Sequence, residues 1–283
     1  MVQSTQHQVL ITIALNQRYI NHCLSLLSSI LENAAFPSKI IFYIFTQQEE
    51  AVDTHMIINL VSKYKAVVNF VEIIPQKYRD LSQIEYKTID AYSRIFAPKI
   101  LHDLGYDKII YLDTDLIVRS DIIKLWEIDL GDATIGAIRD DYYEKGEGFG
   151  PLFNSGVMVI NTERWTHRNI EEEVVQEIRR GQVGKISLAD QDDLNRVLAK
   201  DWKIMNPRWN VMAGDLMSGK VVYKDADIIH FNGNKFNKPD YRWNEHPGKS
   251  EYFHYLRIGR RALLPIIHIP PWLVRVVRRY FSV

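Results

Sequence analysis

The stretch KIIYLDTD, residues 108–115, is an apolar run followed directly by two aspartates. Its first five residues are mostly apolar and β-branched or aromatic, which predicts a strand buried on both faces of a helix-covered parallel sheet. In open α/β sheets, ligands bind beyond the carboxyl ends of the strands. Asp113 and Asp115 therefore lie where a ligand is expected.

Short apolar runs alternate with longer segments of helical period on both sides of this strand. Further strands are predicted at residues 9–15, 40–45, 67–73, 134–138, 157–160 and 227–231. Helices are predicted at residues 19–32, 49–63, 88–102, 170–180 and 188–199. This alternation predicts βαβ units, and hence an α/β fold with a mostly parallel central sheet and flanking helices.

The composition of the 283-residue chain is that of a globular protein, with 46% hydrophobic and 25% charged residues. It has 35 basic and 35 acidic residues, so it lacks the overall basic footprint of a nucleic-acid binder. Cys23 is the only cysteine, which excludes an internal disulfide and predicts a small core residue. With no basic signal-peptide region and no apolar run of ~20 residues, a cytoplasmic protein is expected.

The charges are unevenly placed along the chain. From Tyr252 to Val283 there are six arginines and no acidic residue, so the rest carries 29 basic against 35 acidic groups. On a helical wheel over 271–283, Arg275, Arg278 and Arg279 share one arc. We expect a catalytic domain at 1–256 and a basic amphipathic tail at 257–283. The tail would hold the protein on the inner face of the cytoplasmic membrane, at an anionic surface; the alternative is a C-terminal helix docked on the core.

The aspartate pair has the chemistry of a cation site. Residues two apart in extended chain project to the same side, so Asp113 and Asp115 can converge on one divalent ion held with a diphosphate. His230 ends another apolar run. An imidazole together with two carboxylates favours Mn²⁺, and Mg²⁺ is the alternative ion. The turn at Gly233 would let the backbone approach a ligand. Asn154-Ser155-Gly156 adds an amide and a tight turn.

A bare D-x-D pattern is also found in unrelated settings. It occurs in solvated loops, and it follows an apolar strand in HAD-type phosphohydrolases, although Ile117 stands where that motif has Thr or Val. A catalytically inactive protein that binds a membrane or a partner is a third possibility. Asp192 and Asp193 fit equally well as acids in the first turn of a helix.

Five motifs in order distinguish between these possibilities. They are Ala91-Tyr92-Ser93-Arg94, Tyr111-Leu112-Asp113-Thr114-Asp115, Phe153-Asn154-Ser155-Gly156-Val157, Asp190-Gln191-Asp192, and His230-Phe231-Asn232-Gly233 leading to Lys238-Pro239. Together they resemble the family 8 retaining glycosyltransferases, which include bacterial lipopolysaccharide galactosyl- and glucosyltransferases and glycogenin. The resemblance covers about residues 9–256.

The resemblance implies a GT-A fold, a nucleotide-sugar donor that is usually a UDP-hexose, and a Mn²⁺ ion. By position, it implies Asp113, Asp115 and His230 as metal ligands, with Asp113 also near the ribose, and Lys238 as the diphosphate-binding lysine. It implies donor contacts from the side chains of Arg94, Asp140, Asn154, Asp190, Gln191 and Asp192. The acceptor is expected to be lipopolysaccharide, lipooligosaccharide or another lipid-linked glycan.

Gln191 and Asp190 are the catalytic candidates that the resemblance implies. An amide is a poor nucleophile, so Gln191 would stabilise an oxocarbenium-like centre. Asp190 would form a covalent intermediate, or the acceptor would attack on the face from which the diphosphate departs. The sequence leaves both mechanisms open.

Two positions depart from the family pattern. In the nucleotide-binding run Ala14-Leu15-Asn16-Gln17-Arg18-Tyr19, Leu15 stands where the family has the aspartate that meets uracil, unless Asn16 substitutes; Ala14, Asn16 and Tyr19 are the nucleotide contacts expected here. Before Lys238-Pro239 there are two extra residues, and Asp240 replaces a tryptophan. Lys235 is therefore a rival of Lys238 for the diphosphate.

Overall fold

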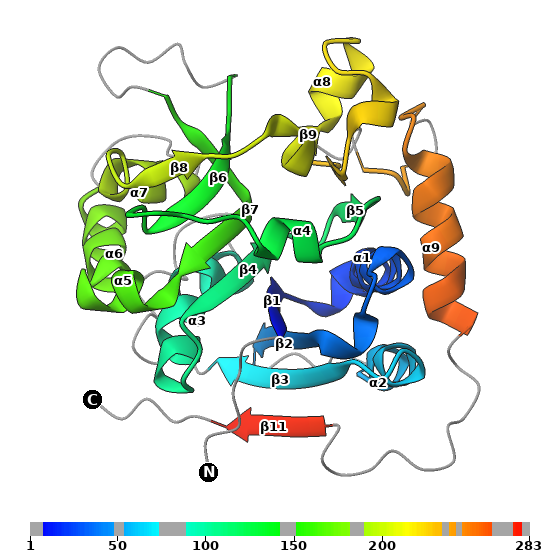
Figure 1. Cartoon of the computed structure of the whole chain (residues 1–283), viewed down its shortest axis with the longest axis horizontal. Coiled ribbons are helices and arrows are strands. Elements are labelled where there is room, and N and C mark those ends of the chain that lie inside the picture. The colour runs from blue at the N-terminus through cyan, green and yellow to red at the C-terminus, as the bar shows by residue number, and fades with distance from the viewer. Residues whose placement is uncertain are drawn as a thin grey trace.

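The computed structural model of the chain describes residues 8–47, 54–73, 89–141, 151–181, 190–233, 238–241, 245–261 and 274–278. A large central sheet has helices packed on both of its faces (Figure 1). The predicted α/β fold with a mostly parallel sheet is confirmed.

The large sheet has eight strands in the order β11-β3-β2-β1-β4-β7-β6-β8. They are β1 (Val9–Ala14), β2 (Ile40–Gln47), β3 (Val67–Ile73), β4 (Lys108–Leu112), β6 (Ile135–Arg139), β7 (Phe153–Asn161), β8 (Trp202–Ile204) and β11 (Val274–Arg278). Neighbours are parallel except at β7, which is antiparallel to both β4 and β6.

A second sheet of three strands positions the site. It consists of β5 (Leu116–Val118), β10 (Ile228–His230) and β9 (Val211–Met212). β5 follows the aspartate pair at once, and β10 runs antiparallel to it with His230 opposite Leu116. This pairing brings His230 beside the D-x-D stretch although more than 100 residues separate them in sequence.

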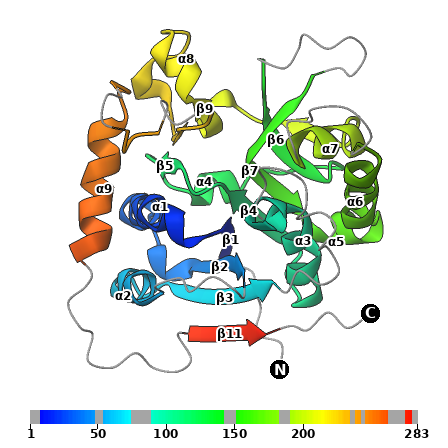
Figure 2. The same cartoon turned by 180° about the vertical axis from the view of Figure 1, so that it is seen from behind.

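The helices form two layers, one on each face of the large sheet (Figures 1 and 2). One core cluster involves α1 (Ile20–Asn33), α2 (His55–Lys63), α4 (Ile123–Trp126) and α9 (Lys249–Arg261). The other involves α3 (Ile89–Asp103), α5 (Thr162–His167), α6 (Ile170–Gly181) and α7 (Asp190–Val197). A short helix, α8 (Ala213–Met217), follows β9.

Successive residues of the inner strands contribute to opposite layers. Leu10 belongs to one core cluster while Ile11 and Ile13 belong to the other, and all three are essentially inaccessible to solvent. Burial of such a side chain stabilises the fold by about 1.5–3 kcal/mol. Cys23 is fully buried in α1, as predicted, and burial raises the pKa of its thiol to about 12.

The strands β1 to β4 and the helices α1, α3, α6 and α7 are placed as the sequence predicts. α2 begins at His55, while the first residues of the helix predicted at 49–63 lie outside the described part of the chain. The sequence did not predict β5, β8, β9 or β11, or the helices α4, α5, α8 and α9. Most of these have six residues or fewer and are too short to show a period.

The C-terminal prediction needs correction. The helix predicted at 271–283 is wrong for Val274–Arg278, which form β11 and pair in parallel with β3 at the edge of the large sheet. β-branched residues favour strands, and the β3 edge offers unpaired backbone groups. The 256/257 division stays a prediction, and α9 runs across it to Arg261. None of the described helices is long and apolar enough to span a membrane.

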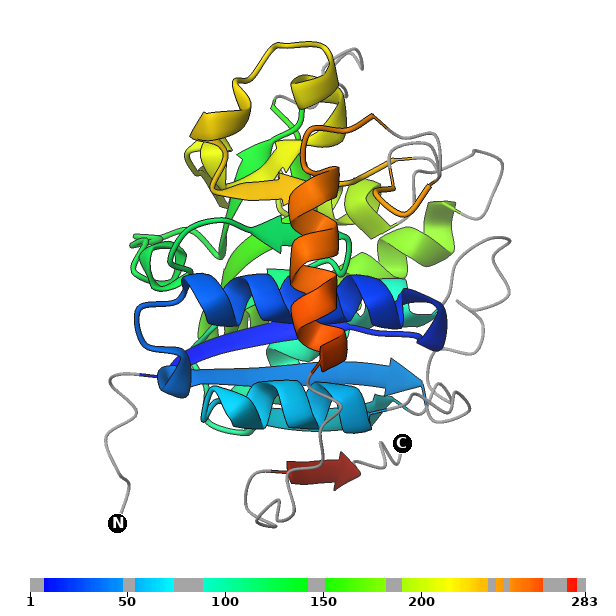
Figure 3. The same ribbon diagram turned by 90° about the vertical axis from the view of Figure 1, so that its right-hand side faces the viewer.

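α9 crosses the outer face of α1 (Figure 3). Ser25 Oγ donates a hydrogen bond to the Tyr252 carbonyl at 3.0 Å, and Asn33 Nδ2 donates to Tyr255 Oη at 2.8 Å. A Cβ added at Gly259 would lie 3.0 Å from both Leu24 Cβ and Ser28 Oγ. Gly259 therefore permits the close approach of the two helices.

We predict that Gly259→Val separates α9 from α1 and lowers the free energy of unfolding by about 1–3 kcal/mol, because a packed interface does not accept the added methyl groups. Chemical denaturation measures the change. Ser250→Val, at an exposed position of the same helix, is the control for helix propensity and should change stability little. Equal stability of the two variants would refute the close-packing role of Gly259.

Candidate active site

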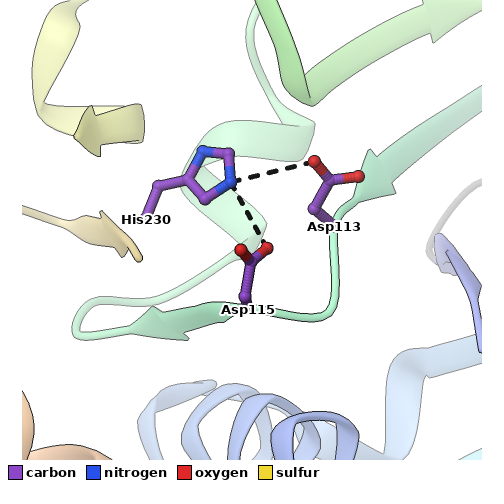
Figure 4. Close-up of side chains that lie close together, drawn as sticks. All are labelled: Asp113, Asp115 and His230. Atoms are coloured by element: carbon purple, nitrogen blue, oxygen red, sulfur yellow. Dashed lines mark ion pairs between the residues drawn. The ribbon is translucent and has the colours of Figure 1, made fainter. Parts of the chain in front are cut away.

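Three potential metal-binding side chains meet where the two sheets join. Asp113, Asp115 and His230 each offer a ligand atom within 4.8 Å of the others. The imidazole Nε2 of His230 lies 3.4 Å from Asp115 Oδ1 and 3.8 Å from Asp113 Oδ2 (Figure 4). Asp115 and His230 are buried, and Asp113 is partly exposed. The sequence prediction named these three residues, and the structure brings them together.

Backbone hydrogen bonds hold the two aspartates in different sheets. The Asp113 N–H donates to the Gly156 carbonyl at 2.9 Å, which extends the pairing of β4 with β7. The Phe231 N–H donates to the Asp115 carbonyl at 2.9 Å, which extends the pairing of β10 with β5. The D-x-D stretch is therefore fixed on both sides of Thr114.

Gly156 leaves the space in which the three side chains meet. A Cβ at this position would lie 2.3 Å from His230 Cε1 and 2.8 Å from Asp113 Oδ2, distances that are sterically forbidden. The prediction of a tight turn at 154–156 is wrong, because these residues belong to strand β7. Glycine is needed here for a close approach of side chains.

Arg94, from α3, orients Asp113. Its Nη2 donates to Asp113 Oδ1 at 2.8 Å, its Nη1 donates to Ser155 Oγ, and its guanidinium lies 5.0 Å from the centre of the Tyr111 ring. Tyr111 Oη donates to the same Asp113 oxygen at 3.0 Å. One carboxylate oxygen of Asp113 is thus held by protein donors, while Oδ2 faces His230.

Lys238 forms an ion pair with Asp115, and its Nζ donates to the Phe231 carbonyl at 3.0 Å. Burial by itself raises the pKa of Asp115, but the Lys238 ammonium outweighs burial and holds that pKa far below its usual range. Burial lowers the pKa of Lys238, and the Asp115 carboxylate more than reverses this. Both groups therefore stay charged at neutral pH. The rival Lys235 lies outside the described residues.

A second group of predicted residues forms a hydrogen-bonded cluster beside the metal-binding candidates. Asn154 Nδ2 donates to Asp140 Oδ2 and to Gln191 Oε1, both at 3.3 Å. Gln191 Oε1 also accepts from the Ser155 N–H at 3.1 Å, and Gln191 Nε2 lies 3.4 Å from Asp140 Oδ2. The amide of Gln191 is thereby fixed against β7.

The two groups line one polar cavity of about 260 Å³. Its walls are Arg94, Asp113, Asp115, Asp140, Asn154, Ser155, Gln191, His230, Asn232 and Gly233. Gly233 has a φ of +88°, which only glycine adopts easily, so the turn after His230 depends on it.

Other predicted site residues lie apart from this lining. Asn16 Oδ1 accepts from the Arg18 N–H at 3.1 Å and so caps a turn, while Leu15 is fully buried. The rings of Tyr19 and His22 pack at a tilt with their centroids 5.4 Å apart, and Ala14 ends β1. The nucleotide contacts proposed for Ala14, Asn16 and Tyr19 stay predictions.

Three acidic residues named in the sequence analysis, Asp190, Asp192 and Asp193, lie in the first turn of α7. Asp190 is the first residue of the helix, and its side chain lies outside the described part of the structure. Asp192 is half-buried and does not line the cavity. Asp193 is buried and forms an ion pair with Arg196 at 2.8 Å, as expected of a structural helix acid.

Sequence reasoning missed two asparagines that support the site. Asn195 of α7 accepts from the Phe153 N–H at 2.8 Å and donates to the Phe153 carbonyl at 2.9 Å, which ties α7 to β7. Asn210 lies at the end of a short 3-10 helix, Pro207–Asn210, and contacts both Asn154 and His230. No motif or period in the sequence marks either residue.

Comparison with known proteins identifies relatives of this chain. The model of the family described as "Glycosyl transferase family 8" matches residues 10–244. General stress protein A of Bacillus subtilis strain 168 is 28% identical over 263 residues, which cover 85% of this chain and 90% of that protein.

Solved glycosyltransferase structures have the same architecture. The galactosyltransferase LgtC, determined in complex with donor and acceptor sugar analogues, superposes with a TM-score of 0.74 at 22% identity, covering 93% of this chain and 98% of that chain. The glycosyltransferase GlyE of Streptococcus pneumoniae TIGR4 gives a TM-score of 0.71 at 19% identity, covering 90% of this chain and 62% of that chain. These likenesses show that the fold is of the GT-A type.

We predict that Gly156→Ala lowers the affinity for Mn²⁺ by at least about tenfold, because the added Cβ displaces His230 or Asp113. Calorimetric titration of the metal-free protein measures the affinity. Gly131→Ala is the control: it replaces a glycine of positive φ whose added Cβ would meet no atom within 4 Å, so it should leave Mn²⁺ binding intact. If Gly156→Ala bound Mn²⁺ as tightly as wild type, the space that Gly156 leaves would not be required for metal binding.

Proposed function

We propose that this chain, which belongs to glycosyl transferase family 8, transfers a hexose, galactose or glucose, from a UDP-sugar to a glycan acceptor with retention of the anomeric configuration. The observation that carries the proposal is the cavity that joins the Asp113, Asp115 and His230 cluster to Asp140, Asn154 and Gln191. Family membership sets aside the phosphohydrolase alternative.

The donor atoms of the cluster fit a divalent cation. Two carboxylates and one imidazole suit Mn²⁺, and Gly156 keeps the space between Asp113 and His230 free of a side chain. When bound, the ion would offset the negative charge of the diphosphate leaving group. Asp113, Asp115 and His230 would hold it.

Two cationic side chains support this role. Lys238 already reaches Asp115, which is consistent with an ammonium that turns to the diphosphate when the donor binds. Arg94 is tied to Asp113 and Ser155, so its first role is to fix the orientation of a metal ligand. A contact from Arg94 to the donor sugar remains part of the proposal.

The cluster around Gln191 would bind the transferred sugar. Asp140, Asn154 and Gln191 present carboxylate and amide groups to the cavity, and such groups can hydrogen-bond to sugar hydroxyls. The Ser155 N–H holds Gln191 Oε1 against β7. In the proposed reaction, the amide of Gln191 would stabilise positive charge at the reacting carbon. Asp190 stands one residue before Gln191 and remains the candidate nucleophile, with same-face attack as the alternative.

We propose a lipid-linked glycan such as lipopolysaccharide as the acceptor, reached from an anionic membrane surface. Arg257, Arg260 and Arg261 are exposed on α9 beside Phe253, whose side chain is 38% exposed. Arg275, Arg278 and Arg279 follow in the same acid-free segment. This concentration of positive charge supports peripheral binding, although part of the segment is a strand.

The activity is tested with a panel of nucleotide sugars, including UDP-galactose, UDP-glucose and their GDP and dTDP counterparts. We predict that wild type releases UDP from a UDP-hexose in the presence of Mn²⁺, and that chelation abolishes the reaction. Asp113→Asn should lower the rate by about 10²–10³-fold, since it removes a charged metal ligand. Asp132→Asn, at an exposed site, is the control.

A wild type that acts on no nucleotide sugar, or an Asp113→Asn variant with full activity, would contradict the proposed function. Turnover of a GDP- or dTDP-sugar alone would overturn the UDP assignment and leave sugar transfer in place.

Membrane binding is tested with vesicles that contain anionic lipid. We predict that Arg275→Gln, Arg278→Gln and Arg279→Gln together weaken binding by about 100-fold, because each arginine contributes about 1 kcal/mol. The control replaces Arg179, Arg180 and Arg196, on helices α6 and α7, with Gln, which changes the net charge equally away from the tail. Equal loss in both triple variants, or binding of wild type to neutral vesicles as strong as to anionic ones, would exclude the tail as the membrane-binding segment.

A further inference from the structure

A continuous line of hydrogen bonds runs from the backbone of β7 to the imidazole of His230. The Gly156 N–H donates to Asn154 Oδ1 at 3.0 Å, and Asn210 Nδ2 donates to the same oxygen at 2.8 Å. Asn210 Oδ1 lies 2.9 Å from His230 Nδ1. Asn154, Asn210 and His230 are all buried.

The backbone N–H of Gly156 determines how the amide of Asn154 is oriented. A backbone N–H only donates, so the side-chain atom that it meets must be the Asn154 oxygen. The Asn154 nitrogen consequently points the other way, toward the acceptor oxygens of Asp140 and Gln191, where it is found. Both ends of this amide are satisfied in one orientation only.

The orientation of Asn154 then determines that of Asn210. Asn154 offers its oxygen, so Asn210 must offer its nitrogen, and the amide oxygen of Asn210 is left facing His230. An amide oxygen only accepts, which requires that His230 carry a proton on Nδ1.

A proton on Nδ1 leaves Nε2 as the nitrogen of the neutral ring with a free lone pair. Nε2 is the atom that faces Asp115 at 3.4 Å and Asp113 at 3.8 Å. The hydrogen bond to Asn210 therefore holds the imidazole in the tautomer and ring orientation that a metal between the three side chains needs. Partners of this kind are known to raise the affinity of histidine ligands for metals.

We propose that Asn210 is a positioning residue for the metal centre: it fixes the Nδ1–H tautomer of His230 and so presents Nε2 to a divalent cation. The inference rests on the proposed function, because it takes the Asp113, Asp115 and His230 cluster as a metal site. It adds a residue outside the five sequence motifs.

The shared use of Asn154 has a consequence for the cavity as a whole. The same amide that orients Asn210 also donates to Gln191 and Asp140. Through Asn154, the Gly156 N–H therefore orients side chains on both the metal-binding side and the sugar-binding side of the cavity.

The tautomer is measured directly on metal-free wild type by ¹⁵N NMR of the histidine side chains, at a pH where the imidazole is neutral. His230→Gln identifies the His230 signals by their loss. The expected spectrum has a protonated Nδ1 and an unprotonated Nε2. A protonated Nε2 with a bare Nδ1 would overturn the proposal, and this experiment needs no variant of Asn210 to fold.

Mn²⁺ titration of metal-free variants measures the effect on affinity. Asn210→Leu removes both hydrogen bonds and should weaken Mn²⁺ binding by about 10–100-fold. Asn210→Asp keeps an acceptor for the His230 Nδ1–H but loses the donor to Asn154, and it should bind Mn²⁺ close to wild type. If Asn210 mattered only for packing against Asn154, both variants would lose affinity alike, which would overturn the positioning role.

Asn195→Leu is the matched control. Asn195 is also a buried asparagine near the site, but its hydrogen bonds go to the Phe153 backbone and the Gln191 carbonyl, and it leaves His230 untouched. It should lower stability and preserve Mn²⁺ affinity; a loss as large as in Asn210→Leu would attribute the effect to general loosening and reject the proposal. If wild type itself binds no Mn²⁺, the proposed metal role fails, while the imidazole spectrum still decides the tautomer.

Discussion

The structure depends on the way in which one short backbone segment joins two sheets. Asp113 continues the pairing of β4 with β7 through the Gly156 carbonyl, and Asp115 continues the pairing of β5 with β10 through the Phe231 N–H. Two residues apart, they continue the hydrogen bonding of different sheets. Their carboxylates are therefore held at the join, and His230 reaches them because β10 ends opposite the start of β5.

The electrostatics of the cavity follow from this placement. Asp115 is buried, and burial alone would favour its neutral form, but the Lys238 ammonium keeps its pKa far below the usual range. Asp113 is held on one oxygen by Arg94 and Tyr111. A charged, oriented pair of carboxylates beside an imidazole is thus built into the fold. This pairing explains why acidic groups tolerate burial at the end of an apolar strand.

The sequence was sufficient for features that repeat along the chain and for chemistry that stands at strand ends. Apolar runs located β1 to β4 and the helices α1, α3, α6 and α7, and the D-x-D stretch and His230 were recognised because each stands at the end of an apolar run. The sequence was insufficient for contacts between residues that are far apart along the chain and meet only in the folded structure. The space that Gly156 leaves for His230 and the hydrogen bond from Asn210 join residues that are far apart in sequence. The sequence also did not predict the C-terminal strand β11, because this strand forms by pairing with the edge of β3.

We propose that Asp113, Asp115 and Nε2 of His230 bind a divalent cation that works with a nucleotide diphosphate. The most direct test is a crystal structure of the wild-type chain with Mn²⁺ and UDP, in which anomalous scattering locates the manganese. We expect one strong anomalous peak, from a manganese ion coordinated by both carboxylates, by His230 Nε2 and by the diphosphate. Manganese bound elsewhere, or a ligand set that lacks any of these three side chains, would contradict the claim.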